Sequence, residues 1–275
     1  MIRQNSKGIP VAKIYYQDAL TTLYLGDCLE VLKEFQDQSV DVILSDPPYG
    51  NNNNNNGDLI HNIEKAIPGR RAKDDDGTRE YEGRPIANDG PEDMRRVVDG
   101  MLLEAARILK KDNSACLVFC GGGGPTPTFA WLADRMGQKG MEFFHAVVWD
   151  KGGLGMGWKY RRNYEMIMVG MRKGAKLKWE WESNGAETAN VVRLNKIIPS
   201  EDQHPTPKPV ELMHHFLRFH AKPGDVVLDP FSGGGTTLVA CREAGIKSIG
   251  IEINEKWAEL TARRLTEPCQ VRFDI

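Results

Sequence analysis

The clearest structural unit in the sequence is the stretch 228–253, LDPFSGGGTTLVACREAGIKSIGIEI. An apolar strand ends at Asp229, a glycine-rich turn follows, a helix begins near Gly235, and a second strand ends at Glu252. This layout is typical of a β-α-β unit that binds an adenosine, because glycine lets a ligand approach the backbone and the acid accepts from ribose hydroxyls. Leu238 stands where a dinucleotide-binding turn has its third glycine, which argues against a nicotinamide cofactor. The alternative is a glycine-rich loop that only packs a helix on a sheet.

Outward from this unit, strands alternate with helices along the chain, which predicts an α/β fold with a mainly parallel sheet. We expect a single domain over 1–275, with a lead-in arm over the first 20 residues, a mobile loop at 51–90 and an irregular polar segment at 171–203. The expected strands are 21–27, 39–46, 114–121, 143–150, 164–171, 225–231 and 248–253, and the expected helices are 28–37, 91–111, 127–138, one after Pro209, 236–245 and 256–265.

Composition limits the class of protein. The chain has 275 residues, 40% of them hydrophobic, which is enough for a substantial core. Its net charge of -2 means that any nucleic-acid surface must come from local clustering of cations. Its five cysteines show no zinc spacing, and no apolar stretch approaches the length of a membrane span. We therefore expect a cytoplasmic protein with reduced thiols and no membrane contact.

A second unusual turn follows the strand at 39–46. The sequence Asp46-Pro47-Pro48-Tyr49 removes two backbone N–H donors, so the strand must stop there. The carbonyls of Asp46 and Pro47 are then left beside a carboxylate and an aromatic ring. This arrangement suits a planar ligand with an amino group, although a proline-rich strand end with a surface tyrosine would read the same.

Four acids lie at the ends of predicted strands: Asp27, Asp46, Asp229 and Glu252. The carboxyl ends of parallel strands meet at one edge of a sheet, where ligands bind. We therefore expect these acids on one rim, where burying several of them is costly unless a ligand uses them. Asp27 is also expected to cap the helix that follows it, with Glu30 three residues later.

Taken together, these motifs resemble the DNA amino-methyltransferases that use S-adenosylmethionine. DPPY (46–49), HPTPKPVEL (204–212) and DPFSGGGTT (229–237) match three family motifs, and their order resembles the permuted beta class. The resemblance covers about 21–50, 91–170 and 204–265. It implies a Rossmann-like methyltransferase fold with helices on both faces of the sheet, a flipped-out target base, and no metal.

The resemblance also implies roles for individual residues. Asp46 and the Pro47 carbonyl would accept the two amino hydrogens of the base, beside Pro48, and Tyr49 would stack on it. Glu252 would bind the ribose, and Asp27 would lie near the adenine amino group of the cofactor. Residues Asp229, Phe231, Gly233 and Gly235 would surround its methionine part, and Thr206 and Lys208 would approach the methionine carboxylate. His204 reads as a loop residue rather than a ligand.

Eight lysines and arginines but one acid, Glu165, lie between 151 and 178. We interpret Lys159, Arg161 and Arg162 as phosphate contacts on DNA, with a solvated hairpin as the alternative. The segments 51–90 and 171–203 would supply a small target-recognition region. Pro268-Cys269 resembles the nucleophile of cytosine-C5 enzymes, but it lies beyond the last expected helix and reads as a tail.

The sequence thus favours transfer of a methyl group to N6 of adenine in DNA, because Asp at the first position of the DPPY turn favours adenine in this family. Cytosine-N4 methylation and a catalytically silent DNA-binding subunit are the alternatives. A second copy of the chain and a cognate restriction enzyme stay open as partners.

Overall fold

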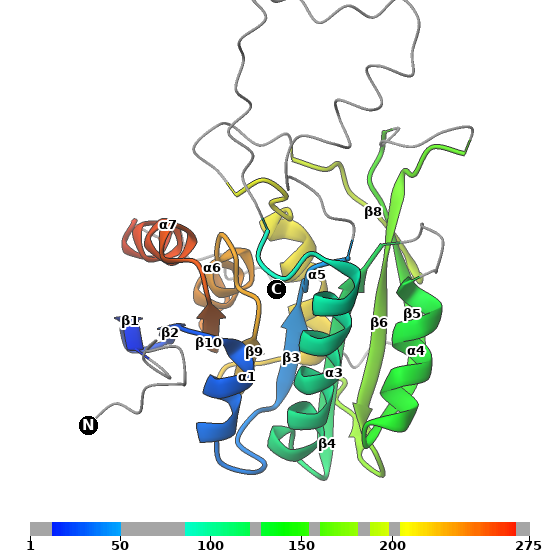
Figure 1. Cartoon of the computed structure of the whole chain (residues 1–275), viewed down its shortest axis with the longest axis horizontal. Coiled ribbons are helices and arrows are strands. Elements are labelled where there is room, and N and C mark those ends of the chain that lie inside the picture. Colours follow the sequence, from blue (N-terminus) through cyan, green and yellow to red (C-terminus); the bar gives the residue numbers. More distant parts are fainter. Residues whose placement is uncertain are drawn as a thin grey trace, which may run out of the picture.

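A computed structural model describes residues 13–50, 86–121, 128–153, 160–180, 188–197 and 204–267. One sheet runs through this part of the chain in the order β1-β2-β10-β9-β3-β4-β6-β5-β8, with β7 beside β4 (Figure 1). The strands are β1 (Lys13–Gln17), β2 (Thr21–Leu25), β3 (Val42–Ser45), β4 (Asn113–Cys120), β5 (Met141–Asp150), β6 (Tyr164–Arg172), β7 (Lys176–Leu177), β8 (Val191–Arg193), β9 (Val226–Asp229) and β10 (Lys247–Glu252).

The centre of the sheet is parallel, as the alternation of strands and helices predicts. Strands β2, β10, β9, β3 and β4 pair in parallel, whereas β6 is antiparallel to both β4 and β5. The strand pair expected from 143–150 and 164–171 is therefore confirmed. Strands β3 and β4 are buried almost throughout, as parallel strands covered on both faces should be.

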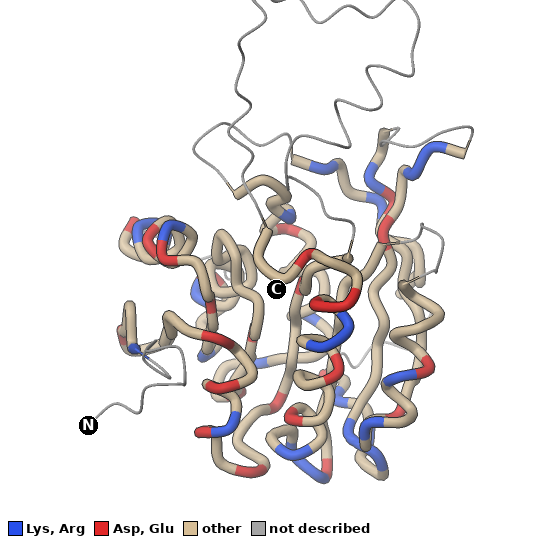
Figure 2. Tube along the Cα trace, in the orientation of Figure 1, with Lys and Arg blue, Asp and Glu red and all other residues tan. Residues whose placement is uncertain are grey.

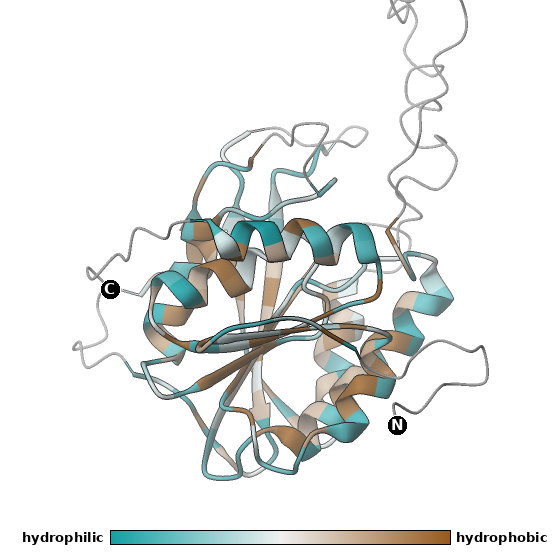
Figure 3. Cartoon of the chain, turned by 90° about the vertical axis from the view of Figure 1, so that its left-hand side faces the viewer, coloured by the Kyte–Doolittle hydropathy of each residue, from teal (hydrophilic) through white to brown (hydrophobic). Residues whose placement is uncertain are grey.

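Helices cover both faces. One face carries α1 (Cys28–Val31), its continuation η1 (Leu32–Glu34), α3 (Pro91–Ile108) and α4 (Thr128–Gln138), and these pack into one apolar cluster. The other carries α5 (Val210–His220) and α6 (Thr236–Glu243), which pack into a second cluster. Helix α7 (Glu255–Thr266) packs near β2 in a third. The hydrophobic residues of the strands lie between these helices (Figure 3).

Helix α3 shows why these residues form a helix. Gly90 precedes it, Pro91 takes the first turn, where its missing N–H costs nothing, and Glu92 and Asp93 complement the helix dipole. Its apolar residues recur at helical spacing and are buried. They are Met94, Val97, Val98, Met101, Leu102, Ala105 and Ile108.

The strand order creates a crevice between β3 and β9. These two strands are neighbours, yet the chain leaves β3 towards α3 on one face and leaves β9 towards α6 on the other. Such a reversal at the carboxyl edge of a parallel sheet leaves room for a ligand. The Pro-Pro turn after β3 and the glycine turn after β9 therefore lie on either side of one opening.

Two expectations need correction. Residues 13–17 form β1, antiparallel to β2, rather than part of a loose arm. The described parts of 171–203 are not wholly irregular, since they include β7 and β8, and β8 extends the sheet parallel to β5. These strands are two and three residues long, which is too short for an alternating pattern to show.

Several other expectations lie outside the described residues. They concern the loop 51–90 up to residue 85, including its asparagine run, and the tail that contains Pro268 and Cys269. Across the described ranges, every helix is too short or too polar to cross a membrane.

Candidate active site

A cavity of about 410 Å³ opens at the crevice between β3 and β9. Both unusual turns line it, and so do all four acids expected on the rim: Asp27, Asp46, Asp229 and Glu252. The convergence predicted from strand ends is thus present. The glycine turn lines one half of the cavity and the Pro-Pro turn lines the other, and Asp229 at the end of β9 bonds Ser45 at the end of β3 between them.

Glu252 organises the glycine turn. Its carboxylate accepts hydrogen bonds from the Gly233 and Asn254 backbone N–H groups, each at 2.8 Å. The side chain is buried, and burial raises the pKa of Glu252 to about 7 despite these bonds. Each carboxylate oxygen can accept two hydrogen bonds, so Glu252 retains acceptor capacity for a ligand in the cavity.

The glycines of the turn have different tasks. A Cβ at Gly233 would lie 3.2 Å from Nε2 of His204, so the absence of a side chain lets the His204 ring pack closely against the turn. Gly235 has φ +76°, and a Cβ there would lie 2.4 Å from Cγ2 of Thr261 on α7. Gly235 thus serves the packing of the turn on α7, behind the residues that line the cavity.

Asp229 joins the two halves of the site. Its Oδ1 accepts from the Ser45 hydroxyl at 2.6 Å and from the Phe231 N–H at 3.2 Å, so it ties the end of β9 to the end of β3. Burial raises the pKa of Asp229 to about 6, against the lowering effect of bonds from Ser45 and Thr237. Asp27 caps α1 by accepting from the Leu29 N–H at 2.9 Å, as predicted, whereas Glu30 bonds Lys33 instead of closing a capping box.

An aromatic pair stands beside Glu252. The rings of His204 and Trp257 meet edge to face, with centroids 5.0 Å apart, and both residues line the cavity. Thr206 lines it too, and its N–H donates to Nδ1 of His204 at 3.4 Å. His204 is therefore part of the cavity wall rather than of a remote loop. Sequence reasoning passed over Trp257, although it lies only five residues after Glu252.

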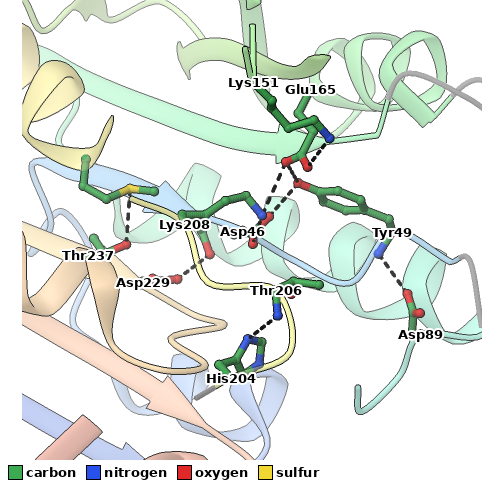
Figure 4. A network of polar contacts seen from close by, with 12 residues as sticks. Asp46, Tyr49, Asp89, Lys151, Glu165, His204, Thr206, Lys208, Asp229 and Thr237 are labelled. Carbon is green, nitrogen blue, oxygen red and sulfur yellow. Dashed lines mark hydrogen bonds and ion pairs between the residues drawn. The ribbon is translucent and has the colours of Figure 1, made fainter. Parts of the chain in front are cut away.

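At the other half, Asp46 belongs to a tight polar cluster (Figure 4). Its Oδ1 accepts from the Tyr49 hydroxyl at 2.7 Å, and its Oδ2 accepts from Lys208. Glu165 on β6 lies 2.9 Å from the same hydroxyl and 3.4 Å from the Lys208 ammonium. Lys151 completes the cluster at 3.2 Å from Glu165. Lys208, expected near the cofactor's methionine carboxylate, thus pairs with the acid of the Pro-Pro turn.

The charges of this cluster support one another. Burial raises the pKa of Asp46, an effect that the Lys208 ammonium opposes. Burial would lower the pKa of Lys208, but Asp46 and Glu165 together raise it, so this ammonium stays charged. Burial also acts to raise the pKa of Glu165, yet Lys208 and Lys151 hold it below its usual value. Two acids and two cations balance in a largely buried group, which buried charges require.

A further acid fixes the conformation of the Pro-Pro turn. Oδ1 of Asp89 accepts from the backbone N–H groups of Tyr49 and Gly50, at 3.1 and 3.0 Å. Asp89 is buried just before α3. No sequence pattern pointed to Asp89 or Lys151 as site residues, and Glu165 stood out only as the lone acid in a basic stretch.

Of the three predicted DNA residues, Arg162 lines the cavity and Arg161 is its exposed neighbour, whereas Lys159 lies outside the described residues. Figure 2 shows Lys and Arg gathered at the ends of β5, β6 and β8 beyond the carboxyl edge. A flexible polyanion could contact these cations while part of it enters the cavity.

Comparisons with known proteins give consistent matches over most of the chain. A family model described as DNA methylase matches residues 40–263. The Type II methyltransferase M.HinfI of Haemophilus influenzae is 26% identical over 272 aligned residues, which cover 91% of this chain and 69% of that protein.

Two solved structures share the fold. A complex of M1.HpyAVI with SAM has a TM-score of 0.62 at 21% identity and covers 90% of this chain and 100% of that one. The PvuII cytosine-N4-specific DNA methyltransferase has a TM-score of 0.66 at 18% identity, covering 93% and 89%. The fold is therefore the Rossmann-like fold of these methyltransferases, as the resemblance implied.

Proposed function

Because the chain belongs to the N6/N4 DNA methylase family, we propose that it transfers a methyl group from S-adenosylmethionine to N6 of adenine in DNA. The observation that carries the proposal is the shared cavity, which joins the buried acid Glu252 to the Asp46 turn. One half is built to hold an adenosine, and the other is built to hold an amino group.

The residues at the glycine turn fit S-adenosylmethionine. Glu252 offers acceptor sites for two ribose hydroxyls, and Gly233 lines the cavity beside it without a side chain of its own. Asp27 and Trp257 line the same half and would flank the adenine ring. When bound, the cofactor supplies an electrophilic methyl group on a sulfonium sulfur. The chain itself needs to supply no nucleophile, and its task is to orient the two reactants.

The residues at the Pro-Pro turn fit the amino group of a flipped base. The lone pair of an exocyclic amine is delocalised into the ring, so the amine is a poor nucleophile. Asp46 and the Pro47 carbonyl would accept hydrogen bonds from its two N–H groups and draw the nitrogen towards a tetrahedral geometry, which frees the lone pair. The nitrogen would bond the methyl carbon as the methyl–sulfur bond breaks and a neutral thioether leaves, and the methylated amine would then lose one proton, with the Asp46 carboxylate as its acceptor. The ring of Tyr49 would supply a stacking face, worth about 1–3 kcal/mol per base.

The choice of base rests on Asp46. In this family an acid at the first position of the turn favours adenine, although adenine and cytosine present the same amino group beside a ring nitrogen. Cytosine-N4 methylation therefore remains the second candidate, and the N4-specific PvuII enzyme shares the fold.

Nucleoside analysis tests the proposal directly. The protein should transfer labelled methyl groups from S-adenosylmethionine to unmodified genomic DNA, and digestion should release the label as N6-methyladenine. Label in N4-methylcytosine would establish the second candidate. Cofactor binding with no transfer to any DNA would instead support a catalytically silent subunit, one that works with a second copy or a restriction partner.

Arg162 should contribute a phosphate contact. Arg162 lines the cavity just before β6, which places it where the DNA backbone beside a flipped base would pass. We expect Arg162→Ala to weaken DNA binding and to reduce the slope of log K against log salt by about 0.9, the value for one lost phosphate contact. Salt-dependent binding to duplex DNA measures this slope. Lys247→Ala is the control, because Lys247 lies at the amino end of β10, away from the cavity, and it should leave the slope unchanged. An equal effect of both variants would contradict a DNA contact by Arg162.

A further inference from the structure

Both oxygens of Asp46 already have partners in the free protein. Tyr49 donates to Oδ1, and Lys208 donates to Oδ2. Each oxygen can accept a second hydrogen bond, but a base amino group that bonds Asp46 must share the carboxylate with these donors, and the Lys208 ammonium weakens it most as an acceptor. Lys208 is also the donor that is harder to move, because a largely buried ion pair is costly to break unless the cation finds another acid.

Glu165 is that other acid. Its Oε2 lies 3.4 Å from the Lys208 ammonium, longer than an optimal charged hydrogen bond, so the contact can shorten by a small rotation of the lysine side chain. The rings of Tyr49 and Phe119 lie 5.3 and 5.7 Å from the same ammonium and favour a cation between them. Lys208 can thus move from Asp46 to Glu165, so that its ammonium still pairs with a carboxylate and still lies beside the same two rings.

We propose that Lys208 moves from Asp46 to Glu165 when the target amino group enters, so that Glu165 is a positioning residue for the methyl-transfer reaction. The inference rests on the proposed function. Glu165 receives the displaced ammonium and keeps the pocket neutral, while Asp46 turns its freed oxygen to the base. Lys151, at 3.2 Å, holds the other oxygen of Glu165 and keeps the receiving carboxylate in place.

The charge of Glu165, rather than its shape, should then matter. In Glu165→Gln the side chain keeps its size, but the ammonium of Lys208 has no second acid and stays on Asp46. The amino group must compete with an intact ion pair. In Glu165→Asp the acid is kept although the side chain is shorter, so the ammonium retains a destination. A purely structural role would give the opposite order, because glutamine preserves the packing and the contact to Tyr49 better than aspartate does.

The experiment measures labelled methyl transfer to unmodified genomic DNA at saturating S-adenosylmethionine, together with cofactor affinity by calorimetry. We expect Glu165→Gln to lower kcat/KM for DNA about a hundredfold and Glu165→Asp to lower it at least fivefold less. Cofactor affinity should stay within twofold for both variants. Glu142→Gln, the same change at an exposed site on β5, is the matched control and should behave as the wild type.

A double variant gives the sharpest outcome. Glu165→Gln combined with Lys208→Gln removes the ammonium that competes with the base for Asp46, so the double variant should be more active than Glu165→Gln alone. A double variant less active than the single one, or Glu165→Gln more active than Glu165→Asp, would overturn the inference. These failures differ from failure of the proposed function, in which the wild-type protein itself would transfer no methyl group to DNA.

Discussion

Asp46→Ala should abolish methyl transfer while leaving affinity for S-adenosylmethionine nearly unchanged. Asp46 faces Lys208, Tyr49 and the target side of the cavity, whereas the glycine turn depends on Glu252. Removing one group that stabilises a transition state in a buried site costs about 10²–10³-fold in rate. Transfer of label to DNA measures the loss, and calorimetry with the cofactor measures what is kept.

The turnover that remains in Asp46→Ala tests whether Asp46 orients the amine. More than about a tenth of wild-type activity would mean an effect below 1.4 kcal/mol, too small for the group that orients the amine. Asp93→Ala is the control, since Asp93 is an exposed acid in the first turn of α3 and should be neutral. Asp46→Asn tests charge alone, and we expect it to fail as well, because an amide is a weaker acceptor than a carboxylate.

Glu252→Ala should weaken cofactor binding by about 2–4 kcal/mol. Hydrogen bonds to a charged group are worth about 1.5–3 kcal/mol each, and two to the same carboxylate rarely add in full. The change also frees the backbone N–H groups of Gly233 and Asn254, which loosens the glycine turn. Calorimetry measures the affinity, and an unchanged Kd would reject the assignment of Glu252 to the ribose.

The same residue should give cofactor binding a pH dependence. Burial raises the pKa of Glu252 to about 7, far above the ordinary glutamate value of about 4.3. The ionised form is the better acceptor for hydroxyls, so affinity should fall as pH drops through 7, by about eightfold between pH 7.5 and 6 from the ionised fraction alone. In Glu252→Gln this dependence should largely disappear, leaving a smaller contribution from Asp229, whose pKa is raised to about 6.

The features that the sequence predicts are those with a local cause. Proline or glycine residues follow β3 and β9, and an acid lies at the end of each strand. The meeting of Asp46, Asp229 and Glu252 then follows from the rule that the carboxyl ends of parallel strands share one edge of the sheet. The capping role of Asp27 is local in the same sense.

The features that it did not predict depend on pairings between distant segments. Glu165 reaches Tyr49, 116 residues away, only because β6 lies antiparallel beside β4. Lys208 reaches Asp46 across 162 residues from a loop whose path has no periodic signal. Its pairing with Asp46 connects the HPTPKPVEL motif (204–212) to the Pro-Pro half of the site.

In this account one cavity binds the methyl donor through Glu252 and orients the target amine through Asp46. The decisive measurement is methyl transfer to DNA by Glu252→Ala and by Asp46→Ala, side by side, up to saturating S-adenosylmethionine. We predict that Glu252→Ala recovers to within about tenfold of wild-type turnover once saturated, because its loss of about 2–4 kcal/mol lies in binding, whereas Asp46→Ala stays at background at every concentration. Turnover by saturated Asp46→Ala, or background activity in saturated Glu252→Ala, would contradict the division of the cavity into these two halves.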